Sequence, residues 1–210
     1  MGPNDILKLA RSQIGVKESP AGSNTVKYNT AFYGRAVSGA AYPWCCAFQW
    51  WLFRELGASE LFCGGKKQAS CTALWNWYKA RGRTVDVKDA RPGDLVLFTF
   101  NAADKKKGIK NHIGLCEANE TGHITTIDGN TGTGNEANGG AVMRRRRAWS
   151  YVSGVVRPDY PQEERKPVEK WYEAARKWAM EQGITDGTRP EDQVSRAEVW
   201  SMLMRLMEGK

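Results

Sequence analysis

Apolar residues in the first part of the chain recur at helical spacing. Ile6, Ala10 and Ile14 mark one amphipathic helix near the start. An apolar stretch over residues 44–56 lies between a proline and a glycine, which predicts a second helix of about three turns. A third helix is predicted over residues 72–81, because a glycine follows it directly. A long polar, glycine-containing stretch separates the first two helices and predicts a loop.

The middle of the chain has the pattern of a β-sheet. A turn signal at residues 91–94 precedes the short apolar run 95–98. The apolar runs 112–118 and 123–128 are separated by turn-forming residues and predict a hairpin. Two closing strands are predicted at residues 140–147 and 151–156. Helices followed by an antiparallel sheet indicate the α+β fold class.

The composition changes at residues 157–167, where three prolines and a charge cluster indicate a linker. We therefore expect a body over residues 1–157, a linker over 158–167 and a small tail over 168–210. The tail has two apolar stripes that predict a pair of helices, and the second begins with the S-x-x-E capping box. So short a segment buries little core, and its tryptophans therefore need a partner surface.

Composition excludes two broad classes of protein. The chain has 210 residues, of which 41% are apolar, so a wholly disordered protein is excluded. No apolar run reaches the roughly 18–20 residues of a membrane span, so we expect no integral membrane segment. The net charge of +8 lies in residues 1–160, because residues 161–210 are nearly neutral. A basic body indicates an acidic partner, such as nucleic acid, a membrane surface or an anionic wall polymer.

The chain has five cysteines and two histidines. The odd cysteine count argues against a fully paired disulfide framework. No Sec-type signal is visible at the start of the sequence, and we therefore expect reduced thiols. No cysteines have the CxxC spacing, so we expect no structural zinc site, no other metal and no cofactor.

Four consecutive arginines at residues 144–147 raise the question of nucleic-acid binding. In a strand these side chains alternate between the two faces and form no single patch. No recognisable nucleic-acid reader element accompanies them. We therefore expect no nucleic-acid partner, and interpret the run as solvated edge positions that contact an anionic wall polymer.

Two residues are candidates for nucleophilic chemistry. A thiol reacts as its thiolate, which needs a positive environment and a nearby base. Cys45 lies at the predicted start of a helix, where free N–H groups and the helix dipole favour an anion. Burial of Cys45 and Cys46 as small apolar side chains is an equally good interpretation of these residues. His112 opens a strand and is the better base, because His123 lies at the hairpin turn.

The hairpin indicates a third member of this group. If the turn is centred near Glu120, His112 and Asp128 lie opposite each other on one face. A turn one residue later makes them diagonal neighbours, about 7–8 Å apart at the backbone. An acid there would hold the tautomer and orientation of the imidazole. Asn130 offers an amide for the same purpose, and both residues also suit an ordinary turn that ends a strand.

Four short motifs occur in the order, and at about the separation, found in one family. They are Trp44-Cys45-Cys46-Ala47-Phe48, Arg91-Pro92-Gly93-Asp94-Leu95, Asn111-His112-Ile113-Gly114 and Ile127-Asp128-Gly129-Asn130. Over residues 5–158 the chain resembles the CHAP family, the cysteine, histidine-dependent amidohydrolases/peptidases. These are papain-like enzymes that cut bacterial peptidoglycan.

The resemblance implies a papain-like fold and a set of site residues. Cys45 would be the nucleophile and His112 the base. Asp128 and Asn130 would be the orienting acid and amide, although the family's acid is often Glu. We also expect Trp44 and Tyr42, beside the nucleophile, to contact substrate. Some members carry a calcium loop of spaced aspartates near the N-terminus, a pattern that this sequence lacks.

The implied function is hydrolysis of a peptidoglycan amide by an endolysin-type enzyme. Muramoyl–alanine amidase and endopeptidase activities are both open, as are a non-catalytic wall-binding or assembly protein and a cysteine peptidase that acts on proteins. The tail over residues 168–210 resembles an S-layer homology repeat, which generally binds wall polymers, and self-association is an equal alternative. Without a Sec-type signal, we expect synthesis in the cytoplasm and action at the bacterial cell wall after release.

Overall fold

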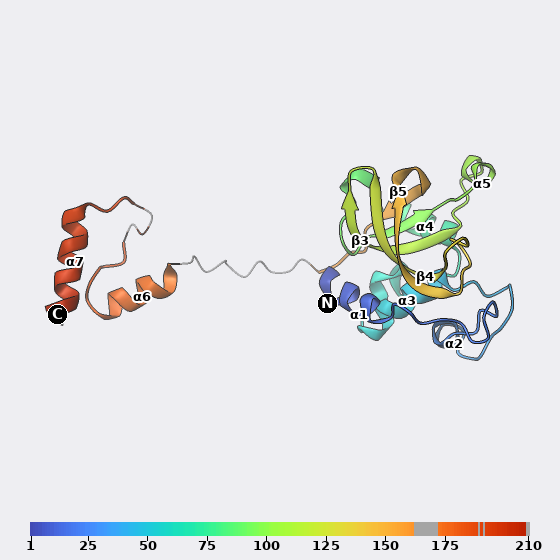
Figure 1. Ribbon diagram of the computed structural model, residues 1–210, viewed down its shortest axis with the longest axis horizontal. Coiled ribbons are helices and arrows are strands. Elements are labelled where there is room, and N and C mark those ends of the chain that lie inside the picture. The colour runs from blue at the N-terminus through green and yellow to red at the C-terminus, as the bar shows by residue number, and fades with distance from the viewer. Residues whose placement is uncertain (162–171, 189, 191, 209–210) are drawn as a thin grey trace. The chain divides into compact units, whose positions relative to one another are not determined.

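The computed structural model describes residues 1–161, 172–188, 190 and 192–208 (Figure 1). The chain forms two compact units, Met1–Pro161 and Gln162–Lys210. Most of the predicted linker and the start of the first predicted tail helix lie outside the described residues.

The first unit is built on a six-stranded sheet with the strand order β1-β6-β2-β3-β4-β5. Every neighbouring pair in this order is antiparallel. The strands are β1 (Thr84–Val85), β2 (Leu95–Phe98), β3 (His112–Glu120), β4 (His123–Thr131), β5 (Ala141–Ala148) and β6 (Val152–Val156). Together with the helices, this sheet confirms the α+β fold class predicted from the sequence.

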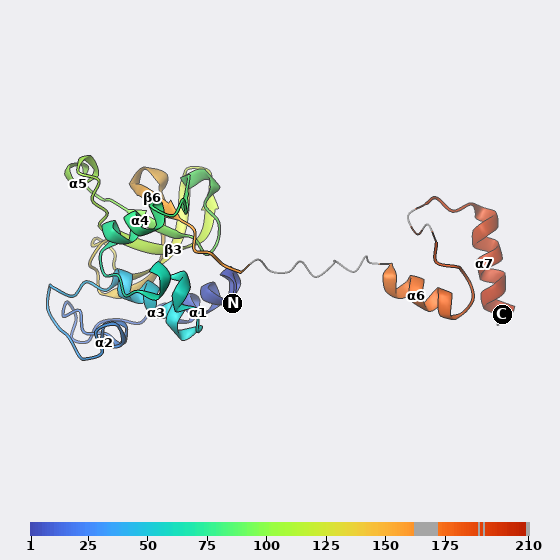
Figure 2. The same cartoon turned by 180° about the vertical axis from the view of Figure 1, so that it is seen from behind.

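Helices pack against the sheet from one side. In Figure 1, α1, α2 and α3 lie together along the sheet, and α3 contacts β3 and β4. Figure 2 shows α4 beside β6, which it also contacts. The α-helices are α1 (Pro3–Ser12), α2 (Lys27–Tyr33), α3 (Cys45–Glu55), α4 (Cys71–Lys79) and α5 (Ala102–Lys106). Short 3-10 helices cover Ser59–Leu61, Cys63–Gly65, Val87–Asp89 and Trp149–Tyr151.

The two faces of the sheet bury different side chains. Leu95 and Leu97 of β2 pack into the large core under the helices. Val96 and Phe98 alternate with them and lie in a smaller core on the other face. This burial on both faces explains why β2 is a continuous apolar run rather than an alternating one.

Helix α3 lies directly on the backbone of β4. A Cβ added at Gly129 would be 2.5 Å from the Cβ of Phe48 and 2.8 Å from Cζ3 of Trp44. Only a residue without a side chain permits this approach. The buried Gln49 donates from Nε2 to the carbonyl oxygen of Ile127 at 3.2 Å and ties the helix to the same strand. The start of α3 is therefore fixed against the end of β4.

The long elements agree with the sequence predictions, whereas the short strand β1 and two short helices were missed. The predicted helices at 44–56 and 72–81 correspond to α3 and α4, and the predicted hairpin to β3 and β4. The hairpin turn has two residues instead of four, because Glu120 pairs with His123. The long loop predicted between the first two helices contains α2, and α5 precedes β3. Both helices are too short to show an apolar period in the sequence.

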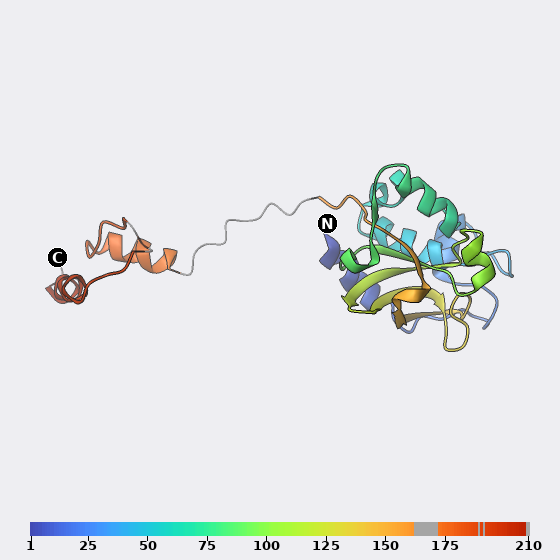
Figure 3. The same ribbon diagram turned by 90° about the horizontal axis from the view of Figure 1, so that it is seen from above.

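The second unit contains two helices, α6 (Glu173–Glu181) and α7 (Arg196–Glu208), drawn in orange and red in Figure 3. The predicted capping box of α7 is confirmed, since Ser195 and Glu198 exchange hydrogen bonds of 2.7 and 3.2 Å. Ile184 is buried. Large apolar side chains are exposed at Trp178, Met180, Val194, Val199, Trp200, Leu203, Met204, Leu206 and Met207. None of the described helices is long and apolar enough to cross a membrane.

Candidate active site

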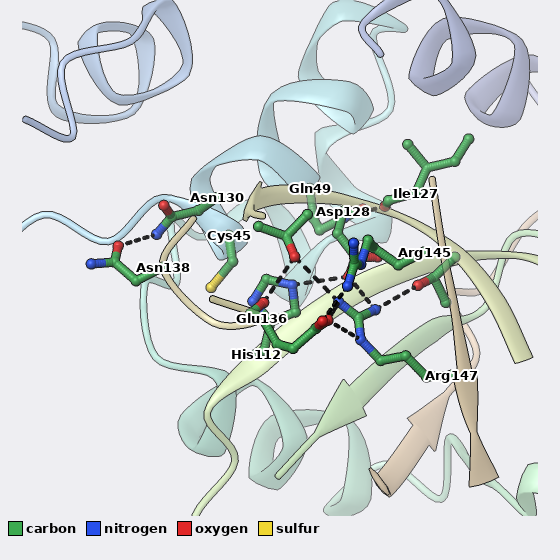
Figure 4. Close-up of polar contacts among 12 residues, drawn as sticks. Cys45, Gln49, His112, Ile127, Asp128, Asn130, Glu136, Asn138, Arg145 and Arg147 are labelled. Carbon is green, nitrogen blue, oxygen red and sulfur yellow. Dashed lines mark hydrogen bonds and ion pairs between the residues drawn. The ribbon is translucent and has the colours of Figure 1, made fainter. Parts of the chain in front are cut away.

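The site forms where the start of α3 meets the start of β3. Cys45 is the first residue of α3 and His112 the first residue of β3. Figure 4 shows the thiol of Cys45 directed toward the imidazole ring. Both side chains are buried, with His112 fully so. The structure thus brings together a thiol and a base that lie far apart in the sequence.

Asp128 completes the group from β4. Nε2 of His112 lies 3.0 Å from Oδ2 of Asp128, and both side chains are fully buried. Leu115 pairs with Ile127, so Asp128 lies opposite Gly114 and diagonally from His112. The turn, in which Glu120 pairs with His123, would by itself place Asp128 opposite Leu115. A register shift between Cys116 and Ala118 moves Asp128 opposite Gly114 and so makes it a diagonal neighbour of His112.

Gly114 provides the space that this diagonal contact needs. A Cβ at position 114 would lie 2.0 Å from Oδ1 of Asp128 and 2.8 Å from Cβ of Thr126. Any other residue would therefore collide with the carboxylate. The glycine belongs to one of the motifs noted in the sequence, but its role depends on strand register and was not predicted.

Arg147 of β5 contacts the same carboxylate oxygen of Asp128 as His112 does. Its Nη1 donates to Oδ2 of Asp128 at 2.6 Å, and its Nε donates to Oε2 of Glu136 at 2.9 Å. The guanidinium lies over the ring of Phe98, 4.7 Å from the centroid. A chain of charges therefore runs from His112 through Asp128 and Arg147 to Glu136 (Figure 4).

The expectation that the arginines at residues 144–147 occupy solvated edge positions is wrong for Arg147. Arg147 is buried and ion-paired, whereas Arg144 and Arg146 are exposed and pair with Glu117 and Glu120. The predicted alternation between faces is correct. The alternation did not reveal that β4 places Asp128 within reach of Arg147.

The charges in this cluster favour a thiolate and an imidazolium. Burial raises the pKa of Asp128, but the Arg147 and His112 charges outweigh it and lower the pKa overall. Burial lowers the pKa of His112, but Asp128 and Cys45 raise it to about 9. Hydrogen bonding from the thiols of Cys46 and Cys71, together with His112, holds the pKa of Cys45 well below its usual range. At neutral pH the arrangement is an ion pair with a nucleophilic sulfur.

The start of α3 also offers donors for a developing negative charge. The first N–H groups of an α-helix have no acceptor within the helix. Phe48 N–H already donates to the carbonyl oxygen of Trp44, which leaves the N–H groups of residues 45–47 ahead of the first helical hydrogen bond. These groups lie beside the sulfur and suit an oxyanion that forms on attack by the thiolate.

Three further predicted site residues differ in their placement. Asn130 is buried with φ of 58°, and its amide donates to Oδ1 of Asn138 at 2.9 Å instead of contacting the imidazole. Trp44 is fully buried against Tyr28 and donates to Glu18 at 2.7 Å, which contradicts a direct substrate contact. Tyr42 is partly exposed, and its substrate contact stays a prediction.

The cysteines do not behave alike. Cys45, Cys46 and Cys71 form a group of potential metal ligands whose sulfur atoms all lie within 4.8 Å of one another. It is the one group of three such ligands within the described residues. The group consists of thiols, which suit soft metals and not calcium. Cys63 and Cys116 are buried elsewhere, and burial raises the pKa of each to about 12.

Comparison with known protein families found one match. Residues 37–130 match the CHAP domain. The match contains Cys45, His112, Asp128 and Asn130, and agrees with the family resemblance over that part of the chain. No curated protein matches the chain by sequence.

Three solved structures are distantly similar to the chain. The wild-type endolysin LysIME-EF1 is 13% identical with a TM-score of 0.47, over 77% of this chain and 66% of that one. Ly7917 is 15% identical with a TM-score of 0.45, over 75% of this chain and 62% of that one. A structure of Ly7917 with the hydrolyzing product of MDP has 16% identity and a TM-score of 0.45. The chain thus spans just under two thirds of the length of these proteins.

Substituting Gly114→Ala tests how the glycine positions Asp128. The added Cβ would displace the carboxylate, so we expect the hydrogen bond between Nε2 of His112 and Oδ2 of Asp128 to be lost. In proton NMR spectra, the strongly deshielded Nε2–H resonance of the wild type should vanish, as in Asp128→Ala. His123→Gln, which removes the other histidine, makes the assignment unambiguous. An unchanged resonance in Gly114→Ala would contradict the proposed clash.

Substituting Arg147→Gln tests the buried ion pair. It removes one of the two cations beside the buried Asp128 carboxylate, and we expect a loss of roughly 3–5 kcal/mol in the free energy of unfolding. Arg146→Gln is the matched control, because its exposed pair with Glu120 should contribute at most about 1 kcal/mol. Urea denaturation measures both changes, and equal effects would rule out a special role for Arg147.

Proposed function

We propose that this chain is a peptidoglycan hydrolase that cleaves an amide bond through Cys45. The observation that carries the proposal is the Cys45–His112–Asp128 arrangement at the start of α3, within residues that match the CHAP domain. A merely structural cysteine would need neither a buried imidazole beside it nor a carboxylate that orients the imidazole. The alternatives are a wall-binding protein with an inert site and a cysteine peptidase that acts on proteins.

The reaction follows the chemistry of a thiolate and an imidazolium. The sulfur of Cys45 attacks the carbonyl carbon of the amide, and the N–H groups at the start of α3 stabilise the oxyanion. His112 gives its proton to the leaving amine, and a thioester remains on Cys45. His112 then takes a proton from water, which attacks the thioester and releases the acid. Asp128 and Arg147 keep the imidazole in one orientation throughout both steps.

The substrate class fits the basic body of the chain. Residues 1–160 contain the whole positive net charge, and wall polymers are anionic. Tyr42 is the residue near the nucleophile that we expect to contact the substrate. The bond is that of a muramoyl–alanine amidase or of a peptidoglycan endopeptidase.

We further propose that the tail attaches the enzyme to its substrate or to a second copy. Its two described helices expose several large apolar side chains, including Trp178, Trp200 and Leu203. Exposed apolar patches of this kind mark interaction sites. The resemblance to an S-layer homology repeat favours a wall polymer, and the exposed apolar side chains favour self-association as well.

Replacing the proposed nucleophile tests the activity. Cys45→Ser should abolish clearing of a suspension of purified cell wall, because a serine hydroxyl beside His112 is not ionised. Cys46→Ser is the matched control on the same helix and should keep much of the activity, since its hydroxyl still donates to the thiolate. Turbidity is the measurement. Equal losses in both variants, or full activity in Cys45→Ser, would refute the assignment.

Fragments released by the wild type identify the bond and separate the alternatives. Mass spectrometry of products from defined peptidoglycan distinguishes a free lactyl group on the sugar from a cut within the peptide. Binding to the wall without clearing would favour the inert binding protein. Cleavage of a protein substrate but not of wall material would favour the cysteine peptidase.

Replacing an exposed tail residue tests attachment. Trp200→Ala removes a side chain that is 66% exposed, and we expect weaker co-sedimentation with purified wall or loss of self-association in analytical ultracentrifugation. Tyr151→Ala, exposed on the first unit, is the control. If Trp200→Ala changes neither property, the tail does not attach through this face.

A further inference from the structure

Three thiols from two helices converge beside the imidazole. Cys45 and Cys46 begin α3, and Cys71 begins α4. The sulfur of Cys71 lies 3.8 Å from that of Cys45 and 3.4 Å from that of Cys46. All three side chains are buried. In the nucleophilic chemistry only Cys45 attacks the amide, and Cys46 and Cys71 act on it through hydrogen bonds.

The spacing of the sulfur atoms matches a metal site. Zinc binds thiolates at about 2.3 Å in tetrahedral geometry, which places the sulfur atoms roughly 3.8 Å apart. The measured separations, all within 4.8 Å, surround this value. We propose that Cys45, Cys46 and Cys71 form a binding site for a thiophilic metal ion such as Zn²⁺.

The imidazole of His112 lies beside one of these thiols. Nδ1 of His112 is buried and has no hydrogen-bond partner among the described residues. In Figure 4 this nitrogen lies on the side of the ring that faces Cys45. Nε2 lies 3.0 Å from Asp128, and a histidine that binds a metal usually donates its other nitrogen to a carboxylate in this way. His112 itself lies outside the group of ligand atoms within 4.8 Å of one another, so the proposed ligands are the three thiols.

The other buried cysteines show what apolar packing alone looks like. Cys63 and Cys116 each lie in a core, outside any group of potential metal ligands within the described residues. Burial therefore does not require the cysteines of this protein to cluster. The approach of Cys45, Cys46 and Cys71 to one another is a separate feature, which a bound metal ion would explain.

A bound metal would switch the site off. It would occupy the sulfur of Cys45, the atom that attacks the amide. The metal-bound protein is therefore inactive, and a chelator restores its activity. This consequence rests on the proposed hydrolase function, whereas the metal binding itself does not.

The test uses the full chain with Co²⁺ as a spectroscopic probe. The protein is stripped with a chelator, kept reduced with a phosphine and titrated with Co²⁺. We expect one Co²⁺ per chain, a sulfur-to-cobalt charge-transfer band and visible bands of tetrahedral intensity, all displaced by Zn²⁺. Absence of the charge-transfer band in the wild type overturns the proposal.

Variants show which thiols bind. Cys71→Ser and, separately, Cys46→Ser should weaken Co²⁺ binding by at least about tenfold and reduce the charge-transfer band. Cys63→Ser is the control and should bind as the wild type does. Circular dichroism establishes that each variant is folded. Wild-type affinity in both folded variants, Cys71→Ser and Cys46→Ser, contradicts the site.

The hydrolase assay separates the two proposals. A wild type that binds Co²⁺ through these thiols but never clears cell wall supports the metal site and refutes the proposed function. A wild type that clears cell wall but shows no charge-transfer band refutes only the metal site. Where both occur, Zn²⁺ should inhibit clearing and a chelator should reverse the inhibition. Clearing that is insensitive to saturating Zn²⁺ contradicts the switch.

Discussion

A single buried carboxylate, that of Asp128, organises the site. A charge without solvent access is stable only with partners, and Asp128 has both His112 and Arg147 at its Oδ2 atom. Other features follow from this requirement. Gly114 leaves the space for the carboxylate. Glu136 pairs with the guanidinium of Arg147 and provides a second carboxylate beside it. The orientation of the imidazole is a consequence of satisfying one buried acid.

The same requirement connects the sheet to the helix that carries the thiol. His112 is held by β4 and β5 through Asp128, while Gly129 lets α3 lie against β4. The thiol and the imidazole thus meet because one strand positions both. Hydrogen bonds from neighbouring thiols and the charge of His112 lower the pKa of Cys45. A sulfur kept ionised in this way can attack a carbonyl carbon, and it can also bind a soft metal ion.

The sequence predicted the parts of the fold that depend on local patterns. Helices α3 and α4 and the β3–β4 hairpin have long apolar runs with clear turn residues at their ends, and they were found where expected. Helices α2 and α5 are too short for a period to show. The burial of Trp44 was also not predictable from its position beside Cys45, because burial depends on Tyr28 and Glu18.

The sequence by itself determined the fold class and the pairing of Cys45 with His112 as the best candidates. The pattern of elements is a local property and sufficed for the fold class. For Cys45 the local properties left burial as an equal alternative, and the resemblance to the CHAP family favoured the pair with His112. Only the tertiary structure decided which arginine of four is buried and that Cys71 joins Cys45 and Cys46. Strand register and the meeting of two helix starts bring these groups together. Such distances depend on how the elements pack, and no spacing along the chain records them.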